Sequence, residues 1–186
     1  MVCSAFIALG SNLNLEGVSS CDLLKEAIME LDKSSLQLQA ISRFFKNPAF
    51  PIGSGPDFVN AVIKVRTHEK AQNVLDQLHA VEKKFGRSRG KRWGKRTLDL
   101  DLIGFGQSVK PNEYAYLYWH CLNREKQFHE VPSDLILPHP RMHERAFVLI
   151  PMLDIAPDWI HPVLLKNTSQ LCDDLSNEDI FELTCM

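Results

Sequence analysis

The sequence has no long hydrophobic run. Among its 186 residues, no apolar segment approaches the roughly 20 residues that a membrane-spanning helix requires. The first residues, MVCSAFIALGSN, have no basic region ahead of a short apolar run and so lack the features of a secretory signal peptide. We therefore expect a cytoplasmic protein without a membrane partner.

The sequence also lacks a metal-binding or disulfide framework built on cysteine. Its cysteines are odd in number, widely spaced and without a C-x-x-C pair: Cys3, Cys21, Cys121, Cys172 and Cys185. This pattern excludes a zinc ribbon and favours reduced thiols in a cytosol. His139 and His143 have the i,i+4 spacing of helical zinc ligands, but the H-E-x-x-H pattern is missing and no third ligand is evident.

The common nucleotide-binding motifs are absent. There is no G-x-x-x-x-G-K-[ST] segment, which excludes a P-loop. Gly53-x-Gly55 is followed by Phe58 where the dinucleotide-binding fingerprint requires glycine. The RNP1 pattern of RNA-recognition domains is missing, and there is no internal repeat.

The composition is that of an ordinary globular chain, with 45% hydrophobic and 24% charged residues, and the length predicts one domain over residues 1–186. The charge is uneven. The whole chain has a net charge of −2, yet residues 83–96 carry eight cationic side chains and no acidic one, which leaves the remainder at −10. The basic run is therefore a local feature, and we expect no general affinity for nucleic acid.

Two aspartates follow the basic run within a leucine-rich strand. Side chains two apart in a strand share a face, so Asp99 and Asp101 project together while Leu98, Leu100 and Leu102 project oppositely. A polyanion bound through a divalent metal would satisfy both charge groups, with metal on the aspartates and phosphates on the arginines. The alternative is that the basic run is a solvated loop, since blocks of like charge are usually exposed, and that the D-x-D pair is a common pattern without a function.

Hydrophobic periodicity predicts an α+β fold. Strands and helices alternate in a ferredoxin-like βαββαβ order, which makes an antiparallel sheet with two helices on one face. The expected elements are strand 2–9, helix 15–31, strand 36–45, strand 57–65, helix 69–85 and strand 97–105.

The third strand has two distinct faces. Val59, Ala61, Ile63 and Val65 form an apolar face for the helices, and Phe58 and Asn60 share the other. Phe58, Asn60, Asp99 and Asp101 should therefore gather on the uncovered side of the sheet. The rim would be formed by the basic run and by a Pro/Gly-rich loop at 46–56.

The remaining segments are less regular. Residues 107–133 have no clean period, and we expect a long excursion such as a hairpin. Pro140 is expected to open a helix that has Arg141 and Arg145 on one face and an apolar side packed inward. The inward residues would be Met142, Ala146, Leu149 and Ile150. Residues 158–186 predict a loop and one short helix.

Five ordered motifs resemble the 6-hydroxymethyl-7,8-dihydropterin pyrophosphokinases of folate biosynthesis over about residues 4–160. They are IALGSN at 7–12, PDFVNAV at 56–62, E-x-x-x-G-R-x-R at 82–89, RWGKRTLDLDLI at 92–103 and LPHPRMHERAFVLIPM at 137–152.

The resemblance implies transfer of the β,γ-diphosphate of ATP to the pterin hydroxymethyl oxygen, with release of AMP. It implies two Mg²⁺ ions as cofactors, ATP and the pterin as small-molecule partners, and a monomer or weak dimer. An alternative from the element order is a non-catalytic nucleotide- or RNA-binding ferredoxin-like module, for which two carboxylates on the phosphate-facing side would have no use.

The resemblance also implies roles for individual residues. Asp99 and Asp101 would hold the metal ions, and Arg87 and Arg96 would stabilise charge during transfer. ATP contacts would come from Glu82, Arg89, Trp93, Arg96, Leu102, His139 and Arg145. The pterin would be bound by Ala49, Phe50, Phe58, Asn60, Trp93 and Phe147. The chain departs from the family in its longer segment before Pro138, and at His79, Asp134, Ile136 and Pro140.

Overall fold

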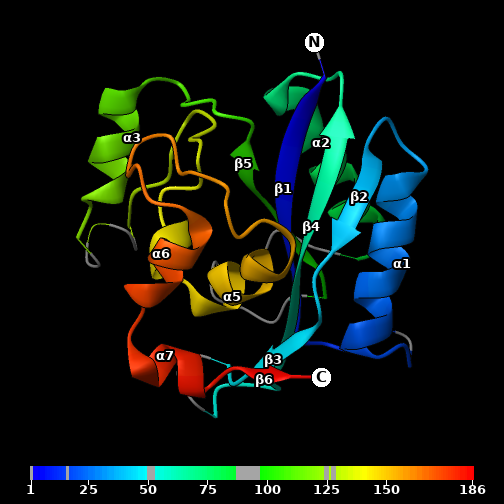
Figure 1. Ribbon diagram of the computed structural model, residues 1–186. Helices are drawn as coiled ribbons and strands as arrows, with labels where there is room; N and C mark the ends of the chain where they lie inside the picture. Colours follow the sequence, from blue (N-terminus) through cyan, green and yellow to red (C-terminus); the bar gives the residue numbers. More distant parts are fainter. Residues whose placement is uncertain (1, 16, 50–52, 87–96, 124–125, 127–128) are drawn as a thin grey trace.

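Strands β1 (Cys3–Ser11) and β4 (Phe58–Thr67) lie side by side at the centre of an antiparallel sheet (Figure 1). The computed structural model describes residues 2–15, 17–49, 53–86, 97–123, 126 and 129–186. Within these residues the strand order is β5-β1-β4-β3-β6, and β2 also pairs with β4. The other strands are β2 (Gln37–Ile41), β3 (Phe45–Asn47), β5 (Asp99–Phe105) and β6 (Thr184–Cys185).

Two helices, α1 (Ser20–Asp32) and α2 (Ala71–Lys84), cover one face of this sheet (Figure 1). The helix stripe of α1 packs with Val59, Ile63 and Val65 of β4 in one apolar core, as the alternation predicted. The predicted α+β class, with an antiparallel sheet and both helices on one face, is confirmed. Helix α1 begins later than expected because the Ser19 side chain caps it by accepting from the Asp22 amide.

The strand predicted over 36–45 is divided in two, which corrects the sequence interpretation. The Ser42 amide donates to the Val62 carbonyl at 3.0 Å, but the Val62 amide donates to the Ser42 hydroxyl at 2.9 Å and not to a backbone carbonyl, so the regular ladder ends here. Arg43 then turns away and forms a two-pronged ion pair with Asp154, at 2.7 and 3.0 Å. Strands β2 and β3 therefore pair separately with β4.

The second face of the sheet was predicted to be uncovered, and this is wrong for the part that includes Phe6, Val62 and Ile103. Helix α5 (Ala146–Ile155) packs over Phe6, Val62 and Ile103, and α6 (Thr168–Asp173) closes this second core (Figure 1). The helix starts at Ala146, not at Pro140, because a short 3₁₀ turn η1 (Met142–Glu144) comes first.

Two further expectations are corrected. The 107–133 segment contains a helix, α3 (Glu113–His120), where a hairpin was expected, because the Asn112 side chain caps it by accepting from the Ala115 amide. The tail forms α6, α7 (Asn177–Phe181) and the short strand β6, which pairs with β3. In the part of the chain that the structure describes, no helix is long and apolar enough to span a membrane.

Candidate functional site

A row of three residues crosses strands β5, β1 and β4. Gly10 of β1 lies opposite Asp99 on one side and Asn60 on the other. Residues directly opposite one another in antiparallel strands point to the same face, so the carboxylate and the amide project together. Asp101 follows two residues along β5 on the same face, roughly 6.6–6.8 Å away between Cα atoms. The predicted grouping of Asn60 with the two aspartates therefore follows from the observed register.

Gly10 has no side chain, and the Asn60 amide approaches the space that a side chain there would occupy. A Cβ atom added to Gly10 would lie 3.2 Å from the Asn60 Oδ1 atom, tighter than most side-chain contacts. Along β1 on this face the side chains shrink stepwise, from Phe6 through Ala8 to Gly10. The β1 side chains on this face therefore fill less space at the Gly10 end than at the Phe6 end, although Gly10 itself is buried.

A chain of amide contacts fixes the orientation of Asn60. The Pro48 carbonyl can only accept, so the Asn47 Nδ2 group donates to it, at 2.9 Å. The Asn47 Oδ1 atom then accepts from the Asn60 Nδ2 group at 2.6 Å. Asn60 therefore turns its Oδ1 atom toward Gly10, where it can accept a hydrogen bond from a ligand N–H group. Sequence reasoning missed Asn47, because its role appears only once β3 is paired with β4.

The Pro/Gly-rich loop is hydrogen-bonded to the residue that follows β1. The Asn12 Nδ2 group donates to the Pro56 carbonyl at 3.3 Å. Gly55 lies close to both the Asn12 side chain and the buried Ala49. This places Ala49, a predicted pterin contact, beside the end of the strand that carries Gly10.

Cationic groups approach the aspartates from the turn before α5. The Arg145 guanidinium lies 3.5 Å from the Asp101 Oδ2 atom. Burial, and then the neighbouring Arg145 and Arg141, lower the pKa of His139 well below its usual range, so the ring is neutral. Its Nδ1 atom accepts from the Arg141 amide at 3.2 Å, so the proton is carried on Nε2, which can donate to an acceptor.

The carboxylate pair suits a hard divalent cation that is also held by phosphate. Mg²⁺ is usually bound by one or two protein carboxylates together with substrate oxygens. Within the described ranges no group of three or more His, Cys, Asp or Glu side chains could hold a metal ion. The donor set of Asp99 and Asp101 therefore fits a metal that arrives with a polyphosphate better than a closed protein cage.

The other predicted residues fall into three groups: some lie near the polar row, some are buried on the helix side of the sheet, and some lie outside the described residues. Phe58 starts β4 two residues before Asn60, and Phe147 is 37% exposed, with the Arg145 guanidinium 5.7 Å from its ring centre. The Leu102 side chain is buried in the core under α1 and α2, so it does not reach the polar face. Glu82 is also buried on that side, where its Oε1 atom accepts from the Leu100 amide at 2.8 Å. Five predicted residues lie outside the described residues: Phe50, Arg87, Arg89, Trp93 and Arg96.

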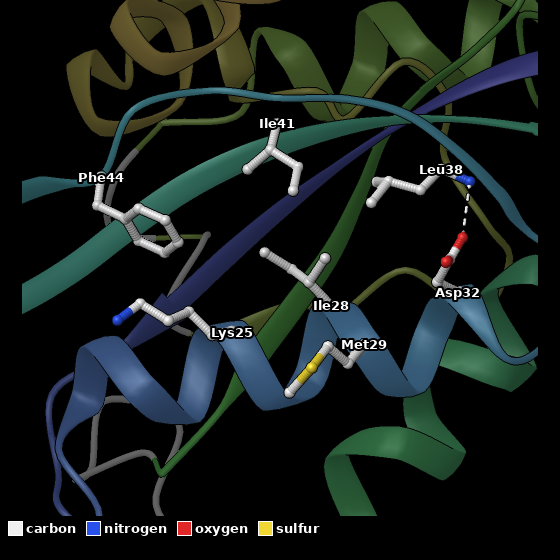
Figure 2. Close-up of a pocket in the computed structure, with 7 residues that line it drawn as sticks. All are labelled: Lys25, Ile28, Met29, Asp32, Leu38, Ile41 and Phe44. Atoms are coloured by element: carbon white, nitrogen blue, oxygen red, sulfur yellow. Dashed lines mark hydrogen bonds between the residues drawn. The ribbon is translucent and has the colours of Figure 1, made fainter.

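A separate apolar groove lies on the opposite side of the molecule, between α1 and the β2–β3 connection (Figure 2). Its volume is about 240 Å³, and a hydrogen bond from the Leu38 amide to Asp32 closes one end. Its lining residues are Lys25, Ile28, Met29, Asp32, Leu38, Ile41 and Phe44. It shares none of the predicted site residues, so the polar row remains the candidate site.

Known proteins resemble the chain in both sequence and fold. The chain is 36% identical over 159 residues to the 2-amino-4-hydroxy-6-hydroxymethyldihydropteridine pyrophosphokinase of Haemophilus influenzae, covering 86% of this chain and 85% of that protein. The protein of the same name from Synechocystis is 33% identical over 172 residues, covering 92% and 75%.

A solved structure of Plasmodium falciparum HPPK-DHPS with pteroate matches 93% of this chain with a TM-score of 0.64, at 15% identity. The chain spans 42% of that longer protein, so this likeness establishes the fold alone. The sequence model of one family matches residues 6–157, which include every described residue of the polar row. The chain belongs to the 7,8-dihydro-6-hydroxymethylpterin-pyrophosphokinase family.

Proposed function

We propose that the polar row carries out the reaction for which the family is named. The β,γ-diphosphate of ATP would pass to the hydroxymethyl group of 6-hydroxymethyl-7,8-dihydropterin. The hydroxymethyl oxygen forms a bond to the β-phosphorus and releases its proton to water, the bond from that phosphorus to the α,β-bridging oxygen breaks, and AMP leaves with the electron pair. The observation that carries this proposal is the Asp99–Gly10–Asn60 row, in which an acid and an amide share a face across a residue with no side chain.

The Asn60 end is the pterin half of this proposal. The backbones at Asn60 and Asp99 are separated by two strand spacings, about 10 Å, and Gly10 adds no side chain between them. The Asn60 Oδ1 atom would accept from an N–H group at the ring edge, and Asn47 holds that amide in place. Phe58 and Phe147 would stack on the ring, with Phe50, Trp93 and the backbone at Ala49 completing the pocket.

The aspartate end is the phosphate half. Two Mg²⁺ ions held by Asp99 and Asp101 would neutralise the triphosphate and orient it for in-line transfer. Arg145 lies against Asp101 and would contact the nucleotide, as would the neutral His139 through its Nε2–H group. Arg87, Arg89 and Arg96 would add positive charge from the basic run.

Glu82 and Leu102 have weaker support as nucleotide contacts, since both side chains are buried on the helix side of the sheet. We further propose that residues 1–186 act as one domain, as a monomer or weak dimer in the cytoplasm. The reaction needs no partner beyond its two substrates.

A product assay tests the proposal. The purified chain is mixed with ATP, Mg²⁺ and 6-hydroxymethyl-7,8-dihydropterin, and the nucleotides are separated. Pterin-dependent AMP is the expected product. ADP would indicate transfer of a single phosphoryl group, and the absence of both would favour the non-catalytic nucleotide-binding module. A reaction without pterin controls for simple ATP hydrolysis.

A further inference from the structure

The helix α3 of the inserted segment is anchored in the protein by a tyrosine. Tyr116 has no exposed surface, although Tyr114 on the same helix is 84% exposed. Its ring lies 5.5 Å from the rings of both His120 and His161, measured between centroids. The His120 ring in turn lies 4.2 Å from the ring of His143. We refer to Tyr116, His120, His143 and His161 as the histidine cluster.

The hydrogen bonds of this cluster run in one direction. The Nδ1 atom of His161 accepts from the backbone amides of Val163 and Leu164, at 3.3 and 3.1 Å, so its proton must be on Nε2. Nε2 lies 3.1 Å from the Tyr116 hydroxyl and donates to it. The hydroxyl proton is then free to be donated to the His120 Nδ1 atom, 3.4 Å away. The relay needs a free lone pair on His120 Nδ1, and the two amide contacts need a free lone pair on His161 Nδ1.

The cluster reaches the candidate site through one short turn. His143 lies within η1, and the backbone amide of Arg145 closes that turn by donating to the Met142 carbonyl at 3.2 Å. Arg145 is the residue whose guanidinium lies 3.5 Å from Asp101. The His143 ring and the Arg145 side chain therefore extend from the same short turn, two residues apart.

We propose that α3 positions Arg145 for the nucleotide through the histidine cluster, with Tyr116 and His143 as positioning residues, and that protonation of the cluster releases this hold. The inference rests on the proposed function, in which Arg145 contacts ATP. It gives the inserted segment a role as a support for the arginine-bearing turn.

The charge state of the cluster agrees with the geometry. Burial, followed by the nearby His143 and His120, lowers the pKa of His161 to about 4. Burial also lowers the pKa of His143, and among the described residues no hydrogen-bond partner is found for its buried Nδ1 atom. The titratable or charged groups around the cluster are Cys121 on α3 and Arg141 and Glu144 beside His143.

The sign of the pH effect follows from these downward shifts. A histidine with a lowered pKa binds fewer protons in the folded state than in the unfolded chain. The stability that it contributes is present above its ordinary value of 6.5 and, for His161, is lost as the pH falls toward about 4. A proton that enters at His161 Nδ1 would face two N–H donors, which breaks the two hydrogen bonds that hold this ring in place.

The test measures ligand binding to the full chain with Tyr116→Phe and His143→Gln. The probes are α,β-methylene-ATP with Mg²⁺, which cannot be cleaved at the reacting bond, and 6-hydroxymethylpterin. At pH 7.5 each variant should bind the ATP analogue about fivefold more weakly, with unchanged pterin affinity. As the pH falls toward about 4, the wild-type affinity should approach that of His143→Gln. The matched controls are the exposed Tyr114→Phe and His68→Gln.

The possible outcomes are distinct. Wild-type affinity for the ATP analogue in both variants would overturn the inference, as would an equal loss of ATP and pterin binding, which indicates general loosening. If one variant fails to fold, as judged by its thermal unfolding, the other decides. Because the probes need no turnover, a wild-type chain that forms no AMP would overturn the proposed function and leave this measurement to judge the inference separately.

Discussion

Two regions of one sheet face are built on the same three strands, but one is packed with apolar side chains and the other carries polar groups. At the packed end, Phe6, Val62 and Ile103 are buried under α5. We call the other end the open end, because β1 has no side chain there: Asn60, Gly10 and Asp99 form a polar row. Only a few residues along each strand separate the two ends. The strand alternation selects the face, and the size of the β1 side chain at each step differs between the two ends, so we expect a ligand to bind where that side chain is smallest.

The largest effect is expected from removing the acids of the open end. Asp99→Ala and Asp101→Ala should each lower turnover at least about 10³-fold, because in the proposed function the polyphosphate would lose the carboxylates that hold its metal ions. The free energy of unfolding should change by no more than about 1 kcal/mol, since neither side chain belongs to an apolar core. Initial rates of AMP formation and urea unfolding measure the two quantities.

The exposed Asp158→Ala is the matched control, and it should leave both quantities unchanged. Chelation of divalent metal should abolish wild-type turnover. A double variant at Asp99 and Asp101 with near wild-type turnover would remove the metal assignment.

The packed end should respond in stability and not in chemistry. Phe6 is 2% exposed and packs edge-on against Trp159, with ring centres 5.6 Å apart. Phe6→Ala should lower the free energy of unfolding by about 3–5 kcal/mol, as for other buried aromatic residues. Turnover per folded molecule, measured at low temperature, should stay near that of the wild type. The milder variant Phe6→Leu serves as a second measurement. If it lost turnover and pterin affinity to the same extent, the two ends of the face would be coupled.

A pair of glycines allows the same change at each end. A Cβ atom at Gly10 would lie 3.2 Å from Asn60 Oδ1, and one at Gly104 would lie 3.3 Å from Phe6 and Trp159. Gly10→Ala should weaken pterin binding about tenfold, whereas Gly104→Ala should reduce stability alone. Fluorescence titration with 6-hydroxymethylpterin and thermal unfolding distinguish the two. Similar pterin affinities in both variants would mean that the pterin does not bind against Gly10.

The sequence predicted the open end better than the packed end, for physical reasons. Asp99 and Asp101 share a face because strand alternation is local, and the order of the elements followed from their periodicity. The row through Gly10 depends on pairing between β1, β4 and β5, which are far apart in the chain. Alternation within one strand carries no information on such register.

The misplaced elements have similar causes. The segment Ala146–Ile155 is apolar on nearly all sides, so its periodicity did not indicate that it covers the second face of the sheet. Helix α3 was missed because its aromatic residues obscure the helical period, although Asn112 followed by Glu113 is a usable start signal. Strand β6 has two residues and is defined by its partner β3 alone.

The smallest effect is expected at Glu82, a carboxylate on the side of the sheet opposite to the polar row. Its Oε1 atom accepts from the amide of Leu100, the residue between the two aspartates of β5. Glu82→Gln keeps an acceptor there and should cost less than about 1 kcal/mol of stability, whereas Glu82→Ala leaves a buried N–H group unpaired, at about 1–3 kcal/mol. The exposed Glu26→Gln is the control, with urea unfolding and ATP-analogue binding as the measurements. If Glu82→Gln weakened ATP binding and left stability intact, the carboxylate would act on the nucleotide although it lies on the helix side of the sheet.

With the geometry observed, Glu82 acts by fixing the strand that presents Asp99 and Asp101. Glu82→Ala should therefore reduce both stability and turnover, whereas Glu82→Gln should reduce neither appreciably.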